Sequence, residues 1–292
     1  MSLNKLHPSQ IQGDLHRNYS VTVPGKWILA GEHSILRVGT AIALPHPEFK
    51  LSLQFVPGQL DQPFSVFPHE FQSTLLEILG DVALPLPAGV LKLESSIPVG
   101  AGLGSSAALC YAVSLWINQN RETDSHSAVE QATRFEDHFH GKSSGLDIAV
   151  VAFNKPILFK MGEEPQILEL RRQPRFTFLD TGLRASTLTC VKQVQAMRLE
   201  HPGRSSHLDL KMADCSLRSA QALRSYADGQ SDLSALSQLA QAMKDAQDCF
   251  AAWGLLPEEA LIMAEDLADQ GALGVKLTGA GGGGFLVALW AD

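Results

Sequence analysis

The sequence predicts a two-domain α+β protein in which strands and helices are interleaved in both halves of the chain. Three observations support this class. Stretches such as Lys50–Val56 alternate apolar and polar residues, which is typical of half-buried strands. Stretches such as Ala235–Phe250 carry apolar residues at helical spacing. The polar segment Gly162–Pro174 separates the two halves, so we expect an N-terminal domain at 1–162 and a C-terminal domain at 163–292.

The N-terminal half begins with apolar stretches that predict strands. Ser20–Val23 is expected to enter a turn at Pro24–Gly25, because proline and glycine favour turns. Trp27–Ala30 and Ala41–Leu44 continue the strand pattern. Val90–Glu94 alternates again and leads directly into a glycine-rich segment.

Helical periodicity begins at Ser105 and predicts a helix of about four turns. A second amphipathic helix is expected at Ser127–His140, with Gly141 as the residue that follows its end. Asp147–Phe153 and Pro156–Phe159 are expected to be short strand or turn segments.

The second half is predicted to open with a strand at Phe176–Asp180 and to be rich in helices after it, including Pro257–Ala268. The chain then closes with a strand at Gly274–Leu277, a glycine tract and a strand at Phe285–Leu289.

The composition is that of a folded protein outside the membrane. The 292 residues are 45% hydrophobic and 18% charged, and the formal net charge of −8 argues against a general nucleic-acid binder. No stretch reaches the roughly 18 consecutive apolar residues of a membrane helix, and the first twenty residues lack an apolar signal core. We therefore expect a cytoplasmic protein with a small-molecule partner. The sequence is also compatible with a homodimer. The four cysteines form no CxxC pair, which argues against a disulfide framework or a zinc site.

The segment IPVGAGLGSSA places three glycines at alternate positions, Gly100, Gly102 and Gly104, directly before a helix. Glycine adopts positive φ angles and lets a ligand approach the backbone, so successive N–H groups can form an anion-binding nest. The N–H groups of the first helical turn add to it, and Ser105 or Ser106 could be an N-cap or a Mg²⁺-binding hydroxyl. The alternative is a glycine-rich turn capped by Ser105 with no ligand.

Two common nucleotide-binding motifs are excluded. The G-x-G-x-G spacing of the loop differs from the G-x-G-x-x-G of dinucleotide-binding folds. Gly141-Lys142-Ser143 does not end a P-loop, because Glu136 stands where that motif requires glycine.

A second glycine tract follows Lys276 and contains five glycines in six positions. A flexible linker could have this composition. Because the tract lies between two strand-like stretches, we expect instead a tight loop packed against another backbone or a ligand.

Glu136 and Asp147 form a candidate acidic pair, one late in a predicted helix and the other in the loop that follows. A phosphoryl transferase needs one carboxylate to hold Mg²⁺ and another to accept or orient the hydroxyl proton. Two solvated acidic residues are the alternative, and it is the neighbouring motifs that favour a functional pair.

Three segments together resemble the signature motifs of the GHMP kinases, the family of galactokinase, homoserine, mevalonate and phosphomevalonate kinases. They are Pro24–His33, Pro98–Ala107 and Lys276–Gly284, which occur in the family's order. The first segment is most similar to the mevalonate kinase branch. The family fold joins an N-terminal domain resembling ribosomal protein S5 domain 2 to a ferredoxin-like C-terminal domain.

The resemblance implies a role for each matched residue. The ATP phosphates would be wrapped by Pro98, Gly100, Ala101, Gly102, Leu103, Gly104, Ser105 and Ser106. Ser106 and Glu136 would hold Mg²⁺, so ATP and Mg²⁺ are the implied cofactors. Asp147 would be the catalytic base, with Lys26 beside it to stabilise negative charge.

The resemblance also implies the acceptor site and the reaction. The acceptor alcohol would be bound by Glu32, His33, Gly279, Ala280 and Gly281. Arg184–Thr187 resembles a short motif that follows the first strand of the second domain. The expected reaction is ATP- and Mg²⁺-dependent phosphorylation of a small-molecule alcohol, with mevalonate, an isoprenoid precursor, as the leading acceptor.

The chain departs from the family pattern in three places. Ser143 stands where the motif around Asp147 usually has proline. Arg37–Thr40 replaces the commoner run after the first motif, and the segment 57–90, where adenine contacts are expected, is short. A sugar or a phosphorylated isoprenoid intermediate is therefore the alternative acceptor, and a non-catalytic ligand-binding relative is the alternative class.

Overall fold

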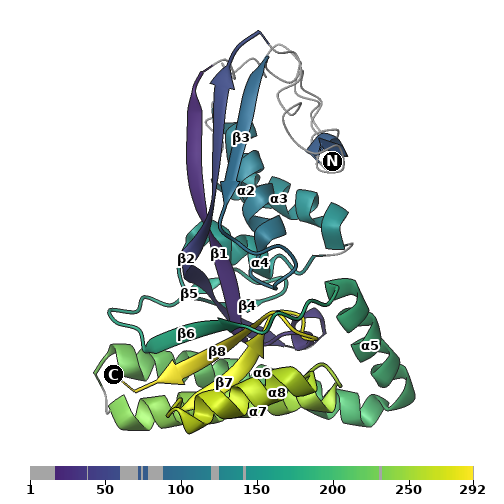
Figure 1. Ribbon diagram of the computed structural model, residues 1–292, viewed down its shortest axis with the longest axis vertical. Helices are drawn as coiled ribbons and strands as arrows, with labels where there is room; N and C mark the ends of the chain where they lie inside the picture. The colour runs from purple at the N-terminus through teal and green to yellow at the C-terminus, as the bar shows by residue number, and fades with distance from the viewer. Residues whose placement is uncertain are drawn as a thin grey trace.

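The computed structural model describes residues 17–37, 39–59, 72–73, 75–77, 88–119, 125–140, 143–229 and 232–291. Gly141, predicted to follow the second helix, and most of the segment 57–90 lie outside these ranges. Two antiparallel sheets, each covered by helices, are stacked along the long axis of the molecule (Figure 1), which confirms the predicted α+β class. Within the described ranges no helix is long and apolar enough to cross a membrane.

The first sheet is built on two long strands, β1 (Tyr19–Ala30) and β2 (Thr40–Pro57), which extend away from the second sheet in Figure 1. β2 also pairs with β3 (Gly89–Ser95) and with β4 (Ile157–Lys160), and β4 pairs with the short β5 (Gln166–Ile167). All of these pairings are antiparallel. The predicted strands of the N-terminal half are therefore confirmed, several of them as parts of longer strands.

The predicted turn at Pro24–Gly25 is wrong, because β1 runs straight through it. Pro24 pairs with Lys50 and Lys26 with Pro45, so that residues 46–49 of β2 bulge out opposite Gly25. Glycine is required here for a close approach rather than for a turn. A Cβ at position 25 would lie 3.0 Å from the carbonyl oxygen of Leu103.

Three helices pack beside the first sheet: α2 (Ser105–Asn118), α3 (Ser125–His140) and α4 (Leu146–Phe153). The first two confirm the predicted helices, but the third corrects the expectation of a strand or turn at Asp147–Phe153. This short apolar stretch is buried almost throughout, and periodicity cannot separate a buried helix from a buried strand. Gly145, with φ of 81°, begins the helix in a left-handed conformation.

The second sheet has the strand order β6-β8-β7. Its strands are β6 (Arg175–Asp180), β7 (Gly274–Thr278) and β8 (Phe285–Trp290), as predicted. The chain therefore changes from one sheet to the other between Ile167 and Arg175.

Four helices accompany the second sheet. They are α5 (Thr187–Glu200), α6 (Pro202–Ala227), α7 (Asp232–Ala252) and α8 (Glu258–Asp269). Helices α6, α7 and α8 lie along the sheet, and α5 lies at the edge of the molecule (Figure 1).

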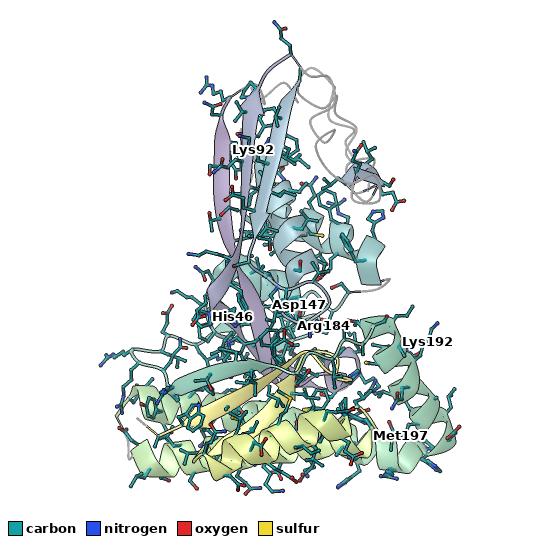
Figure 2. All side chains as sticks on the ribbon, viewed as in Figure 1. His46, Lys92, Asp147, Arg184, Lys192 and Met197 are labelled. Atoms are coloured by element: carbon teal, nitrogen blue, oxygen red, sulfur yellow. The ribbon has the colours of Figure 1, made fainter. Side chains whose placement is uncertain are left out.

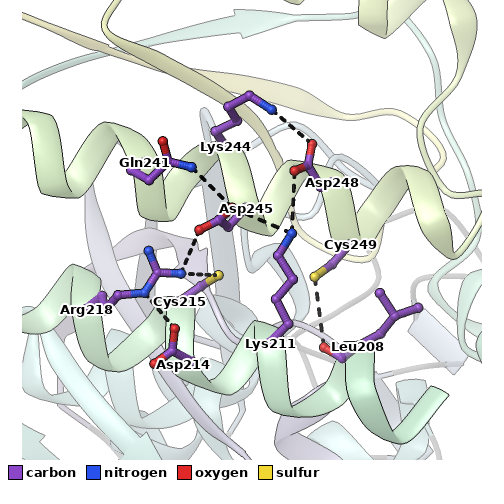
Figure 3. A network of polar contacts seen from close by, with 10 residues as sticks. All are labelled: Leu208, Lys211, Asp214, Cys215, Arg218, Gln241, Lys244, Asp245, Asp248 and Cys249. Carbon is purple, nitrogen blue, oxygen red and sulfur yellow. Dashed lines mark hydrogen bonds and ion pairs between the residues drawn. The ribbon is translucent and has the colours of Figure 1, made fainter. Parts of the chain in front are cut away.

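Helices α6 and α7 pack against each other along a buried interface, and charged pairs lie beside it (Figure 3). Arg218 on α6 donates to Asp245 on α7 at 2.8 Å and to Asp214 on its own helix at 2.6 Å. Cys215 lies beside Arg218 and Cys249 beside the Leu208 carbonyl, both as buried thiols. The other two cysteines are also free and buried, which confirms that the chain has no disulfide framework.

The two sheets meet at β1. Trp27 packs edge-on against Phe176 and Phe178 of β6, with ring centroids 4.9 and 5.4 Å away. The hydroxyl of Thr278, at the end of β7, accepts from the Ile28 N–H at 2.8 Å and donates to the Ile28 carbonyl at 3.0 Å. The first motif on β1 and the second glycine tract are therefore held side by side.

Candidate functional site

Lys26 and Asp147 form an ion pair where the two sheets meet. The Lys26 ammonium lies 2.8 Å from Asp147 Oδ2 and donates to the carbonyl of Gly102 at 2.9 Å. The backbone N–H of Lys26 donates to the Leu103 carbonyl at 3.0 Å, so the lysine is fixed against the glycine loop at two points. Its side chain is 3% exposed, whereas that of Asp147 is 28% exposed and can reach a ligand. Figure 2 shows Asp147 at this junction.

In the glycine loop, glycines with a left-handed backbone alternate with buried side chains. Gly100, Gly102 and Gly104 have φ angles of 71°, 77° and 76°, a region that other residues rarely adopt. Between them, Ala101 and Leu103 are buried in the core. The loop is therefore a rigid, backbone-lined turn, which is what a phosphate-binding nest requires.

The beginning of α2 has no serine cap, which was one of the possibilities for Ser105. Gly104 is the N-cap residue, without a side-chain hydrogen bond, and Ser105 is the first residue of the helix. The left-handed conformation at the cap favours glycine over serine, so the alternative of a turn capped by Ser105 does not hold. A helix N-terminus without a capping side chain is a suitable place for an anion.

The second glycine tract forms the loop between β7 and β8 and touches the first loop. A Cβ at Gly102 would lie 3.0 Å from Gly279 Cα, and one at Gly284 would lie 2.8 Å from the carbonyl oxygen of Ala101. The tract is mostly buried between two paired strands. The tight loop is therefore confirmed, and the flexible linker is ruled out.

A shallow pocket, open to solvent, lies where the two glycine loops meet. Both loops line it, together with Thr278 and with Ala185 and Thr187 around the start of α5. The four-residue segment Arg184–Thr187 thus lies beside the loops, while Arg184 itself is paired with Asp180 at 2.7 Å.

The contact between the loops gives a matched pair of glycine variants. Gly100 and Gly102 have the same left-handed backbone, but a Cβ at Gly100 would meet nothing within 4 Å. Both alanine variants should suffer the cost of about 1–2 kcal/mol for a left-handed alanine. For Gly102→Ala the free energy of unfolding should fall by roughly a further 1–3 kcal/mol, because the added Cβ would push the two loops apart. Binding of a non-hydrolysable ATP analogue, measured by calorimetry beside urea unfolding, checks this, and equal losses in the two variants would contradict it.

Glu136 is a buried carboxylate on α3, with 1% of its surface exposed. Burial, followed by the charge of Asp147, raises its pKa to about 8. The Ser143 hydroxyl donates to Glu136 Oε2 at 2.6 Å and Lys26 lies nearby, and both act in the opposite direction. A bound cation would offset the burial and the repulsion from Asp147, so the site fits a metal ion.

Ser106 lies in the first turn of α2. It is four residues before Cys110, so the two share one face of the helix. Burial, followed by the charge of Glu136, raises the pKa of the Cys110 thiol, which places the carboxylate near that face. Mg²⁺ is commonly held by one or two protein oxygens together with substrate phosphates, and Ser106 with Glu136 suits that pattern. Groups of three or more His, Cys, Asp or Glu side chains that could hold a metal are absent from the described ranges.

Glu32 and His33 face the second sheet. Glu32 Oε1 lies 2.7 Å from the ammonium of Lys276, and both side chains are buried. His33 has an unusual φ of 60° and its Nε2 donates to the Ala280 carbonyl at 2.8 Å. Burial lowers the pKa of His33 to about 4, so the ring is neutral at pH 7. These contacts fix the second glycine tract against the first motif, and whether either side chain also touches the acceptor stays a prediction.

Sequence reasoning missed several residues that hold the site. Lys276 and Thr278 were seen only as the beginning of a glycine motif, although they bind β1 and Glu32, two residues beyond its end. Arg37, noted only as a departure from the family, forms a bidentate ion pair with Asp209 of α6. A lysine and a threonine at alternate positions of an otherwise apolar strand were the available signal.

Family models match both halves of the chain. The model described as "GHMP kinases N terminal domain" matches residues 72–155, and "GHMP kinases C terminal" matches residues 220–292. The mevalonate kinase of Archaeoglobus fulgidus is 26% identical over 92% of this chain and 91% of its own. That of Aeropyrum pernix is 27% identical over 95% of this chain and 90% of its own.

Solved structures share the fold over most of the chain. The L. major mevalonate kinase in complex with R-mevalonate has a TM-score of 0.74 and 23% identity, over 94% of this chain and 87% of its own. Streptococcus pneumoniae phosphomevalonate kinase in complex with phosphomevalonate and AMPPNP has a TM-score of 0.72 and 17% identity, over 94% and 92%. Lactococcus lactis galactokinase complexed with galactose has a TM-score of 0.71 and 16% identity, over 97% and 88%. At these identities the likeness establishes the fold and leaves the acceptor open.

Proposed function

The chain belongs to the GHMP kinases and is an ATP-dependent small-molecule kinase, and on this premise we propose that it phosphorylates mevalonate to 5-phosphomevalonate. The choice of acceptor is supported by two relatives named mevalonate kinase that match more than nine-tenths of the chain. The observation that carries the chemistry is the contact between Lys26 and Asp147 beneath the glycine loop.

The proposed mechanism assigns the proton to Asp147. One of its oxygens, Oδ2, is held by the Lys26 ammonium, so Oδ1 is the oxygen we assign to the acceptor hydroxyl. The acceptor oxygen would form a bond to the γ-phosphorus as the bond to the ADP oxygen breaks, and its proton would pass to Asp147. Lys26 would stabilise the charge that develops, because its ammonium lies between the carboxylate and the phosphate loop.

The remaining proposed roles concern ATP and Mg²⁺. The loop from Pro98 to Ser106 would bind the phosphates through its backbone, and Ser106 with Glu136 would hold Mg²⁺. When bound, Mg²⁺ neutralises charge on the phosphates. The second tract, at Gly279–Gly281, would border the acceptor with Glu32 and His33.

A panel of acceptors tests the proposal. ADP release would be measured with mevalonate, phosphomevalonate, galactose and homoserine at a fixed ATP concentration. We expect kcat/KM for mevalonate to exceed the others by about 100-fold or more, since sites built to bind specific polar groups discriminate strongly. A larger value for another alcohol would identify a different acceptor. ATP binding without ADP release from any alcohol would favour a ligand-binding relative instead.

The presence of the whole set of reactive side chains argues against the ligand-binding alternative. Lys26, Ser106, Glu136 and Asp147 are all retained, and a sensor that only binds a ligand has no use for a lysine–aspartate pair beside the phosphate loop.

A further inference from the structure

Ser143 contacts the carboxylate that we assign to the metal. Its hydroxyl donates to Glu136 Oε2 at 2.6 Å and accepts from the Gly145 N–H at 3.1 Å. Its own N–H donates to Asp137 Oδ1 at 2.7 Å. The hydroxyl proton is therefore committed to Glu136, and the serine is fixed between the end of α3 and the beginning of α4.

The contact depends on the serine that this chain carries. A proline at position 143, as in the motif that the segment resembles, has neither a hydroxyl nor an N–H and could make none of these bonds. Glu136 is also almost completely buried, so solvent is poorly placed to supply a substitute donor. Within the described part of the chain, no hydrogen bond to the other carboxylate oxygen, Oε1, is present.

We propose that Ser143 keeps Glu136 Oε2 engaged and leaves Oε1 as the single ligating oxygen, which makes Ser143 the residue that sets the preference of the site for Mg²⁺ over Ca²⁺. The inference rests on the proposed metal role of Glu136. Mg²⁺ requires a compact octahedral shell, in which a carboxylate contributes one oxygen, whereas Ca²⁺ takes six to eight ligands and accepts carboxylates through both oxygens. Ligation through both oxygens of Glu136 would require the bond to Ser143 to break.

The geometry of the loop supports a positioning role for Ser143. The hydroxyl that fixes Glu136 also accepts from the backbone N–H of Gly145, the N-cap residue of α4. Asp147 lies in the first turn of that helix. A single side chain thus holds the metal carboxylate at a set orientation relative to the predicted catalytic aspartate.

Cation binding to the full-length protein tests the proposal directly. Affinities for Mg²⁺ and for Ca²⁺ would be measured by calorimetry in the presence of a non-hydrolysable ATP analogue. Partners that orient a metal ligand typically change affinity by about 10–100-fold, so Ser143→Ala should weaken Mg²⁺ binding by about tenfold or more. Binding of Ca²⁺ should weaken less or tighten, so the Mg²⁺/Ca²⁺ affinity ratio should fall.

Two further variants keep the test specific. Ser143→Thr retains the hydroxyl and should restore a ratio close to that of the wild type. As a control, Thr133→Ala removes a hydroxyl on α3 that donates to the Val129 carbonyl at 2.9 Å. This variant should leave the ratio unchanged. Thermal unfolding of each variant establishes that it is folded before the affinities are compared.

The outcomes separate this inference from the proposed metal site. Equal weakening of Mg²⁺ and Ca²⁺ in Ser143→Ala, or no change in either, overturns the role in selectivity. Glu136→Gln should weaken Mg²⁺ binding whether or not Ser143 acts on it. If Glu136→Gln binds Mg²⁺ as the wild type does, the metal lies elsewhere and the proposed site fails together with this inference.

Discussion

Asp147→Asn is expected to lower kcat by about 10²–10⁴-fold, the usual contribution of a general base. The amide has the shape of the carboxylate but cannot accept the hydroxyl proton. The affinity for ATP should change little, because the Lys26 ammonium still donates to the Gly102 carbonyl and keeps the phosphate loop in place. Steady-state turnover with saturating ATP and acceptor measures this, together with calorimetry of ATP-analogue binding.

Lys26→Met completes the test of the pair. Methionine retains much of the apolar stem that packs beneath Gly104 and removes the charge. Its kcat should also fall, and the double variant should lose less than the product of the two single losses, because the two groups act as a unit. Glu130→Gln, an exposed acid-to-amide change on α3, serves as the control and should keep wild-type turnover. A kcat within about threefold of wild type for Asp147→Asn, well below the expected loss, would remove this residue from the mechanism.

Much of the fold could be predicted because its signals are local. Alternation in β2 and β3 and helical spacing in α7 report directly which side of each element is buried. The glycine loops could be found for the same reason, since left-handed positions such as Gly100 and Gly102 strongly favour glycine.

Other features could not be predicted because they depend on distant parts of the chain. Gly25 looks like a turn residue, yet its lack of a side chain serves the approach of Leu103. Helix α4 carries a short, mostly buried apolar stretch, and such a stretch does not distinguish a helix from a strand by its periodicity. Sequence alone could pair Lys26 with Asp147 only through a family resemblance, since the two are far apart in the chain and meet only when β1 and α4 pack together.

The buried ion pair between Glu32 and Lys276 is the clearest example of a contact that could not be predicted from the sequence. Lys276 is completely buried, and its ammonium donates to Glu32 Oε1 at 2.7 Å and to the Ile28 carbonyl at 3.3 Å. It also lies 5.3 Å from the centre of the Phe250 ring. Burial raises the pKa of Glu32, and the nearby Lys276 opposes that rise. The pair joins the first motif to the strand before the second glycine tract, so it holds these two parts of the site together.

Lys276→Met should therefore lower the free energy of unfolding by about 3–5 kcal/mol, because it leaves the Glu32 carboxylate buried without its counter-charge. Glu32→Gln should also destabilise the protein, since it leaves the ammonium unpaired. The double variant should recover part of the loss, because a neutral amide and a thioether need no counter-charge. Urea unfolding measures all three, and Lys160→Met is the control, since the exposed pair of Lys160 with Glu163 should contribute less than about 1 kcal/mol. Additive losses in the double variant would show that the two charges do not stabilise one another.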